Sequence, residues 1–252
     1  MDPELQFLRP DWPAPPSVRA VVSTRAGGVS RGHWAGLNLA DHVGDDPDAV
    51  AENRRRLRAA LALPAEPFWL TQVHGTVVAV AGGAERPPAD AGITREPGRV
   101  CATLTADCLP VLFASRSGDR VGIAHAGWRG LADGVVEATV RSLGGDPTEL
   151  LAWLGPAIGP QSFEVGPDVR DAFLAVAASA AAHCRPTAPD RWLVDLYGIA
   201  RQRLAACGVT AVFGGGLCTY RDGARFYSFR RDATTGRMAS LIWLLPPSAA
   251  GG

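Results

Sequence analysis

The sequence predicts an α+β fold in which mixed β-sheets are covered by helices. In the middle third of the chain, short apolar runs typical of strands outnumber helical segments and do not alternate with them one for one. That pattern favours mixed sheets over a doubly wound parallel sheet. The chain has 252 residues, of which 47% are hydrophobic, so it can form one large domain or two small ones. Loose segments are expected at 1–17 and 246–252.

The first predicted elements are a strand and a well-marked helix. Val18–Thr24 is a β-branched, apolar run. Asp46 then offers an N-cap and Pro47 a first helical position, and the helix is expected to continue to about Leu63. Its apolar face carries Val50, Leu57 and Leu61.

The central segment carries a series of short apolar runs that we interpret as strands. These runs are Phe68–Val73, Thr76–Val80, Val100–Thr105, Leu109–Ala114 and Arg120–His125. A helix is expected next, from about Gly130 to Leu143, because the glycine pair at 144–145 would end it.

The C-terminal part predicts both strands and helices. The predicted strands are Leu150–Leu154, Val209–Phe213, Arg225–Arg230 and Met238–Leu244. The predicted helices are Asp168–His183 and Trp192–Cys207, the second with Leu193, Leu196, Ala200 and Leu204 at helical spacing.

Composition excludes several classes of protein. All 25 basic residues are Arg, so Schiff-base chemistry and Walker-type phosphate binding, which need Lys, are excluded. The formal net charge is zero and the charges are mixed, which argues against nucleic acid as a partner. No apolar run approaches the roughly 18 residues of a membrane span. An odd number of cysteines and no signal-peptide pattern predict a cytoplasmic protein with free thiols.

Three segments place a His or a Cys where an apolar strand meets a turn. They are 71–75, 105–110 and 125–130, which contribute His74, Cys108 and His125. No two of these residues are close in sequence, unlike the ligands of a zinc finger. Two His and one Cys would suit a tetrahedral metal with an open fourth position, as in catalytic zinc sites.

Other interpretations of the same residues stay open. Without metal, Cys108 and His125 could act as nucleophile and base of a hydrolase. A blue-copper site usually has an axial Met, and the only methionines are Met1 and Met238, so that interpretation is poor. A metal-binding partner protein without catalytic activity is a third hypothesis.

Several arginines are candidates for binding anions. Arg129 lies between glycines within the third segment, close after His125, and its guanidinium could bind phosphate through two parallel hydrogen bonds; a solvated surface Arg is the alternative. Arg25 precedes two glycines whose N–H groups could face an anion. Arg230 belongs to a third basic cluster at 230–237. His42, in a Gly-rich loop, could line a pocket but is interpreted as a surface residue.

The motifs together identify a resemblance. In order, they are STRAGGVS, LNLADHVGDDPDAVAENRRRL, TQVHG, ADAGIT, TADCLPV, HAGWRG, GPAIGPQSFEVG and FYSFRRDATTGRMASLIWL. From about Val18 to Leu244 the chain resembles the YfiH or laccase-domain family, also called the peptidoglycan editing factor family. TADC with HAGWRG is highly specific. One position departs from the family pattern, because members often have His or Tyr where Phe229 stands.

The resemblance implies both a fold and a chemistry. The fold is a single domain, 18–245, with two mixed sheets in a four-layer helix–sheet–sheet–helix sandwich. The ligands of zinc would be His74, Cys108 and His125. Members are associated with phosphorolysis of adenosine, inosine and methylthioadenosine and with adenosine deamination. Some are linked to copper-dependent polyphenol oxidation, which makes copper the alternative metal, and some to excluding serine from peptidoglycan precursors.

The leading hypothesis is therefore a monomeric, zinc-dependent purine nucleoside enzyme. Cys108 and His125 would serve in catalysis as well as in binding metal, Arg129 would bind phosphate, and Asp107 would act as general acid/base or orient a His ligand. Asn38 and Gln72 are candidates for hydrogen bonds to the base or ribose. A four-copper laccase is excluded, since it needs about ten His, many in His-x-His pairs, and this chain has five His and no such pair.

Overall fold

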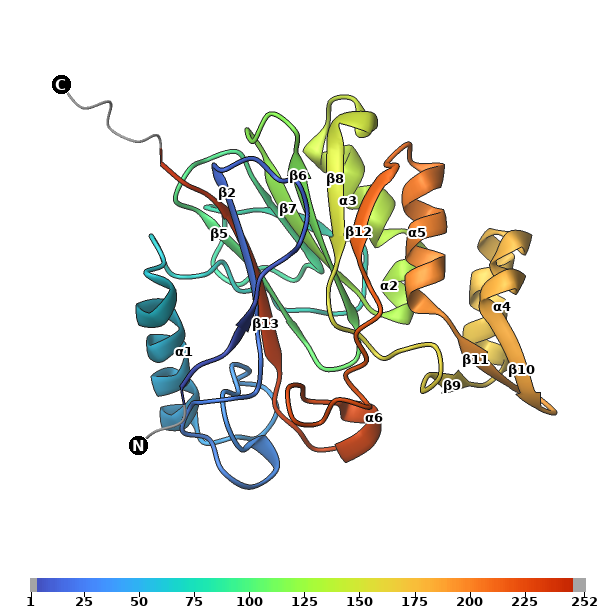
Figure 1. The fold of residues 1–252 in the computed structure, drawn as a ribbon, viewed down its shortest axis with the longest axis horizontal. Coiled ribbons are helices and arrows are strands. Elements are labelled where there is room, and N and C mark those ends of the chain that lie inside the picture. Colours follow the sequence, from blue (N-terminus) through green and yellow to red (C-terminus); the bar gives the residue numbers. More distant parts are fainter. Residues whose placement is uncertain (1–3, 247–252) are drawn as a thin grey trace.

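Two large β-sheets carry the chain in the computed structural model, which describes residues 4–246 (Figure 1). The smaller is antiparallel throughout and is ordered β1 (Phe7–Leu8), β2 (Val18–Ser23), β13 (Met238–Leu244), β5 (Val100–Thr105). The larger has parallel pairs at both edges and antiparallel pairs between them, so it is mixed. Its order is β12 (Ala211–Gly214), β8 (Leu150–Leu154), β6 (Leu109–Ser115), β7 (Val121–Ala126), β4 (Ala91–Thr94), β3 (Val78–Val80).

Three groups of buried apolar side chains join sheets and helices. Between the sheets, Ile242 of the small sheet packs with Leu112 and Ile123 of the large one. Outside the small sheet, Leu57 of α1 (Pro47–Leu61) packs with strand residues such as Leu241. Outside the large sheet lie α3 (Val135–Leu143) and α5 (Leu196–Ala206). Figure 1 accordingly shows α1 on one side of the sheets and α3 and α5 on the other.

A small unit projects from the α5 side of the molecule (Figure 1). It consists of α4 (Pro167–Val176), a 3-10 helix (Ala178–His183) and an antiparallel sheet ordered β10 (Cys184–Ala188), β11 (Arg191–Val194), β9 (Glu164–Val165). The helices predicted over Asp168–His183 and Trp192–Cys207 are therefore too long. Asp195 explains the second error, because its side chain accepts a hydrogen bond from the Tyr197 N–H and so caps α5 after an extended segment.

The structure confirms strands at Val18–Ser23, Val100–Thr105, Leu150–Leu154 and Met238–Leu244, and also the helix that Asp46 caps. The helix predicted from Gly130 to Leu143 is two helices, α2 (Trp128–Asp133) and α3, because Gly134 has a φ of 101° and interrupts it. The two mixed sheets that were expected are one mixed and one antiparallel, with the three-stranded sheet in addition.

Two predicted strands are wrong. Phe68–Val73 contributes only isolated bridges, from Phe68 and Thr71. Arg225–Arg230 leads into the short helix α6 (Phe229–Asp232), with Tyr227 buried and its hydroxyl donating to the Trp34 and Ala35 carbonyls.

The chain ends also bear on the predictions. β1 lies within 1–17 and pairs with β2, so this part of the segment expected to be loose is bound to the sheet. Of the predicted C-terminal loose segment, 247–252 lie outside the described residues. Within residues 4–246, no helix is both long and apolar enough to span a membrane.

Candidate metal centre

Two strand ends and a turn bring His74, Cys108 and His125 together. Cys108 directly precedes β6, and His125 is the penultimate residue of β7, its antiparallel neighbour, where it pairs with Pro110. His74 comes from the turn before β3, at the edge of the same sheet. The ligand atoms of the three side chains all lie within 4.8 Å of one another, and the Cys108 Sγ is 3.8 Å from the His74 Nε2. The sheet thus assembles residues that are distant in sequence.

Asp90, which we did not single out from the sequence, organises this cluster. Its carboxylate is fully buried and accepts hydrogen bonds from the backbone N–H groups of Val73, His74 and Gly75 at 2.7–3.1 Å. It also accepts the Nδ1–H of His125 at 2.8 Å. His74 has a φ of 61°, a left-handed conformation that is uncommon for a non-glycine residue. The three N–H groups that converge on Asp90 stabilise that turn.

Gly127 explains part of the HAGWRG motif. A Cβ atom at this position would lie 2.9 Å from the His74 Cδ2 and 3.1 Å from the Cys108 Sγ. A Cβ at Gly130 would lie 3.0 Å from the Gly75 carbonyl oxygen. The two glycines therefore let the start of α2 approach the cluster and the His74 turn closely.

The cluster shifts the pKa values of its own members. Burial by itself would raise the pKa of the Cys108 thiol, but the two histidines lower it to about 6. Burial by itself would lower the pKa of His125, but Cys108 and Asp90 raise it to about 9. Burial likewise opposes ionisation of Asp90, while His125 and the backbone N–H groups lower the pKa of its carboxyl. The site therefore favours a thiolate, which is the form of Cys that binds metals.

The donor set fits a zinc-type ion. Because the Nδ1–H of His125 is donated to Asp90, its Nε2 is left for a metal, the arrangement that carboxylates commonly impose on metal-binding histidines. Tetrahedral zinc with bonds of about 2.0–2.3 Å needs ligand atoms roughly 3.3–3.8 Å apart, and the separation of Cys108 and His74 already falls at that limit. Among the described residues, this is the one group of three or more His, Cys, Asp or Glu found close enough to hold a metal.

A cavity of about 330 Å³ opens over the cluster. Its walls are formed by His42, Gln72, His74, Leu104, Thr105, Ala106, Cys108, His125, Phe229 and Arg237. His42, interpreted from sequence as a surface residue, is 60% exposed in its side chain and yet lines this cavity. Phe229 is 56% exposed, and the Cζ of Arg237 lies 5.8 Å from the centre of its ring.

Asp107, adjacent in sequence to Cys108, serves a different part of the chain. Its carboxylate accepts hydrogen bonds from the Thr219 and Ser228 hydroxyls at 2.6 and 3.0 Å and from the Arg230 N–H at 2.7 Å. The carboxylate that orients a His ligand is thus Asp90, whereas the sequence suggested Asp107. Asp107 holds the 219–230 loop, which carries Phe229 to the cavity.

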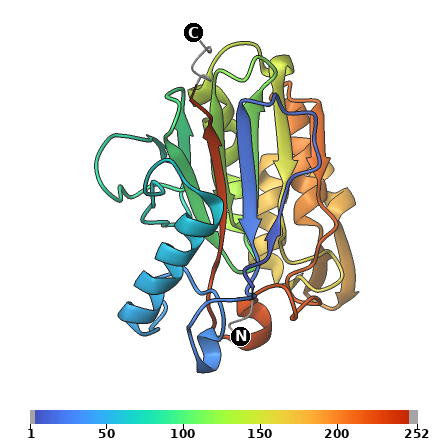
Figure 2. The ribbon, with the colours of Figure 1, turned by 60° about the vertical axis from the view of Figure 1, so that its left-hand side comes forward.

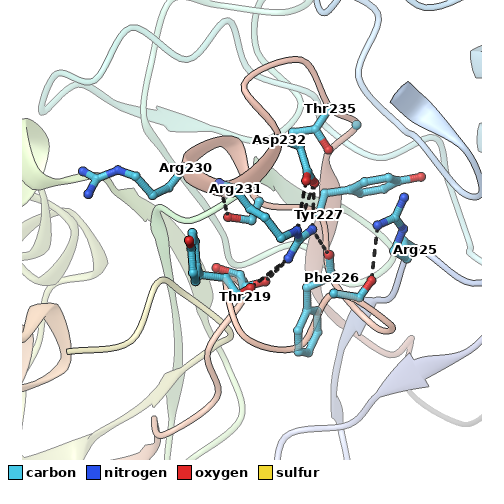
Figure 3. Close-up of polar contacts among 12 residues, drawn as sticks. Arg25, Thr219, Phe226, Tyr227, Arg230, Arg231, Asp232 and Thr235 are labelled. Atoms are coloured by element: carbon cyan, nitrogen blue, oxygen red, sulfur yellow. Dashed lines mark hydrogen bonds and ion pairs between the residues drawn. The ribbon is translucent and has the colours of Figure 1, made fainter. Parts of the chain in front are cut away.

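The candidate substrate-binding residues occupy different environments. Gln72 lines the cavity, but both ends of its amide are hydrogen-bonded to the Leu104 backbone. Asn38 is fully buried and is not a cavity residue. Arg25 stacks on Tyr227 and donates to the Gly223 carbonyl (Figure 3). Arg230 points away from Arg25 in the same view and donates to the Glu164 carbonyl.

Arg129 is exposed, and its guanidinium stacks on the Trp128 ring at 4.3 Å. It does not line the cavity over the cluster. Arg237, which does, was noted in the sequence only as part of a basic cluster. The sequence signals that could have revealed the missed residues are a buried acid at the start of an apolar strand, for Asp90, and an Arg directly before a buried strand, for Arg237.

Comparison with known proteins places these residues in a family. The family model described as multi-copper polyphenol oxidoreductase laccase matches residues 19–245. The purine nucleoside phosphorylase PA4543 of Pseudomonas aeruginosa is 59% identical, with 94% of this chain and 98% of that protein covered. The purine nucleoside phosphorylase YfiH of Escherichia coli K12 is 55% identical, with 95% and 99% covered. The crystal structure of Neisseria meningitidis protein NMB0706 superposes with a TM-score of 0.91 at 47% identity, covering 95% and 99%.

Proposed function

Because the chain belongs to the multi-copper polyphenol oxidoreductase laccase family, and its relatives at 59% and 55% identity are named purine nucleoside phosphorylases, we propose that it is a purine nucleoside phosphorylase. The observation that carries the proposal is the cluster of His74, Cys108 and His125 at the base of a cavity of about 330 Å³. Cavities of roughly 300–1,000 Å³ hold small-molecule ligands in proteins.

The proposed substrates are adenosine, inosine and methylthioadenosine, with deamination of adenosine as a second reaction of the same site. The proposed metal is zinc, held by His74, Cys108 and His125 with a fourth position open to ligand. Two nitrogens and one thiolate support zinc, since that set with an open position is typical of catalytic zinc sites. A bound zinc would supply a Lewis acid that polarises a substrate oxygen.

In phosphorolysis a phosphate oxygen forms a bond to C1′ of the ribose. The bond from C1′ to N9 of the purine breaks, and the base leaves with the electron pair and takes up a proton. The chain's own contribution is positional. Asp90 holds His125 and the His74 turn in place, and the exposed ring of Phe229 offers a face on which a flat purine can stack.

A Cys–His hydrolase is the second candidate, because the histidines hold the pKa of Cys108 at about 6 and so provide a nucleophilic thiolate. The two candidates differ in their need for metal. Removing the metal with a chelator should abolish the activity of a zinc-dependent phosphorylase, whereas a hydrolase that uses the Cys108 thiolate should stay active.

The experiment measures zinc content and phosphate-dependent conversion of inosine to hypoxanthine in wild type, Cys108→Ala and Cys207→Ala. Cys207 is half-buried and lies just after α5, away from the cavity, so it is the matched control. We expect about one zinc per chain in wild type and Cys207→Ala, and loss of most zinc and activity in Cys108→Ala. Equal zinc in all three proteins would refute the metal assignment, and activity that resists chelation would favour the hydrolase.

We further propose that the domain, 18–245, is a monomer with four layers, helix–sheet–sheet–helix. The four layers are supported by the three apolar clusters, which join α1 to the small sheet, the small sheet to the large one, and the large sheet to α3 and α5.

A further inference from the structure

Arg237 lies in the wall of the cavity over the His74, Cys108 and His125 cluster. It directly precedes β13 and is half-buried. The rest of that wall is apolar, neutral or part of the metal cluster, since it consists of His42, Gln72, Leu104, Thr105, Ala106 and Phe229 together with the three cluster residues. Arg237 is therefore the permanently charged group that faces the cavity.

The protein holds Arg237 firmly on one side. Its Nη1 donates to the carbonyls of Thr235 and Gly236 at 2.8 and 3.0 Å. Its backbone N–H donates to the Oδ1 of Asn38 at 2.9 Å. Asn38, which the sequence suggested as a substrate contact, thus positions Arg237 from within the core.

On the other side of the guanidinium, Nε and Nη2 have no hydrogen-bond partner among residues 4–246, and the Cζ lies 5.8 Å from the centre of the Phe229 ring. Among residues 4–246, no carboxylate forms an ion pair with Arg237, and its hydrogen bonds from the side chain all come from Nη1. Burial lowers the pKa of Arg237, with Cys108 and Asp107 opposing that effect. Neither of these neighbours is free to pair with it, since Asp107 already accepts three hydrogen bonds and Cys108 faces the two histidines.

Three other half-buried arginines are paired with carboxylates. Arg54 lies 3.4 Å from an Asp41 oxygen, Arg120 lies 3.0 Å from one of Asp119, and Arg203 contacts Glu137. Desolvating a charge is costly unless an opposite charge compensates for it. Arg237 lacks such a partner and lies in a cavity wall, where a ligand can supply the opposite charge.

We propose that Arg237 binds the inorganic phosphate used in phosphorolysis, with its Nε–H and Nη2–H groups directed to two phosphate oxygens. This rests on the proposed phosphorylase activity and gives the phosphate a residue other than Arg129. A guanidinium edge of two parallel N–H groups matches a phosphate through two hydrogen bonds. Because the same cavity is lined by His74, Cys108 and His125, a tetrahedral oxyanion bound by Arg237 would lie within the proposed active site.

The test compares Arg237→Gln, Arg237→Lys and the control Arg201→Gln. Arg201 on α5 also donates to two backbone carbonyls, those of Val212 and Gly214, and lies outside the cavity. Losing a charge-assisted contact costs about 1.5–3 kcal/mol, so the KM for phosphate should rise about 10- to 100-fold in Arg237→Gln. We expect a smaller rise in Arg237→Lys, because an ammonium keeps the charge but not the two parallel hydrogen bonds.

Three further readouts separate this role from a structural one. Zinc content, the KM for inosine and the melting temperature should stay close to those of Arg201→Gln. Binding of inorganic phosphate to the zinc-loaded protein, followed by phosphorus NMR, should weaken in parallel with the KM for phosphate. An unchanged KM for phosphate in Arg237→Gln, or loss of zinc from it, would overturn the proposal.

The outcome also distinguishes the two levels of the hypothesis. If zinc-loaded wild type binds phosphate through Arg237 but phosphorolyses no nucleoside, the phosphate site stands and the proposed function fails. If wild type is active and substitution of Arg237 does not change the KM for phosphate, the proposed function stands and the phosphate site fails.

Discussion

Two buried aspartates lie beside the candidate metal cluster, and their carboxylates bind different parts of the chain. The carboxylate of Asp90 accepts hydrogen bonds from His125 and from the turn that carries His74, so it supports the cluster. Asp107 is adjacent to Cys108 in sequence, but its carboxylate accepts hydrogen bonds from the Thr219 and Ser228 hydroxyls and from the backbone N–H of Arg230. Proximity in sequence to a ligand therefore does not identify the residue that supports it; the direction of the side chain does.

The difference follows from backbone geometry. Asp107 has a φ of 89°, an unusual conformation that Asp adopts more readily than most residues. The same turn leaves Asp107 accepting hydrogen bonds from the 219–230 loop. Asp90 lies directly before β4, next to β7, and its carbonyl also accepts the His125 N–H at 2.7 Å. One aspartate thus acts on the ligands and the other on the loop beside them.

Asp90→Asn should have the largest effect. An amide offers one acceptor oxygen and one donor nitrogen, so it cannot accept all four hydrogen bonds that the carboxylate receives. Loss of a carboxylate that supports a metal-binding His typically weakens metal binding 10- to 100-fold. We expect a reduction of that order in zinc affinity, measured by competition with a chromophoric chelator.

The comparison would fail if Asp90→Asn retained the zinc affinity of wild type while Asp107→Asn lost it. A folded Asp90→Asn protein is the condition for this measurement, and circular dichroism checks it. If the variant does not fold, Asp90→Glu, which keeps the charge and displaces it by one methylene, provides the same comparison.

Asp107→Asn should have an intermediate effect of a different kind. Asn also tolerates a positive φ, so the loss is confined to an acceptor for one of three donors. We expect stability to fall by about 1–3 kcal/mol and zinc affinity to stay within about twofold of wild type, a change below 0.5 kcal/mol. Because the loop carries Phe229, the KM for inosine should rise more than the KM for phosphate. Equal rises in both would show that Asp107 does not act through the loop.

The strands that the sequence predicted correctly explain where sequence patterns are informative. Val100–Thr105, Leu150–Leu154 and Met238–Leu244 are buried along their whole length, and a continuous apolar run is the mark of such strands. Phe226 and Tyr227 are equally buried, but they fill space beside Met238 without strand partners. The sequence can therefore indicate that a segment is buried, but it cannot indicate which distant segment packs against it or pairs with it.

The candidate site shows the same limit. His74, Cys108 and His125 stand out because they are chemically distinctive side chains at strand ends. Asp90 and Arg237 have weaker signals, since each is a single charged residue directly before an apolar strand, and the fold shows that both lie beside those three. Asn38 was expected to contact substrate, but the fold buries it and uses it to hold the Arg237 backbone.

Arg129→Ala should have the smallest effect, and it extends the comparison from aspartates to arginines. Like Asp107, Arg129 lies close in sequence to a residue of the proposed metal site, and like Asp107 it contacts another part of the chain. Its guanidinium is exposed and stacks on Trp128, a contact worth about 0.5–1 kcal/mol at such a position. Arg237 instead lies in the cavity wall with half of its guanidinium unpaired. We therefore expect Arg129→Ala to change the KM for phosphate less than about fivefold, since 1 kcal/mol corresponds to roughly that factor.

The measurement is the pair of rates, inosine with phosphate and adenosine without phosphate, on zinc-loaded protein. If phosphorolysis fell 10-fold or more while deamination did not, Arg129 would be the phosphate ligand, as its position after His125 first suggested. Sequence proximity would then have been the better guide than the direction of the side chain, and Arg237 would lose its proposed role.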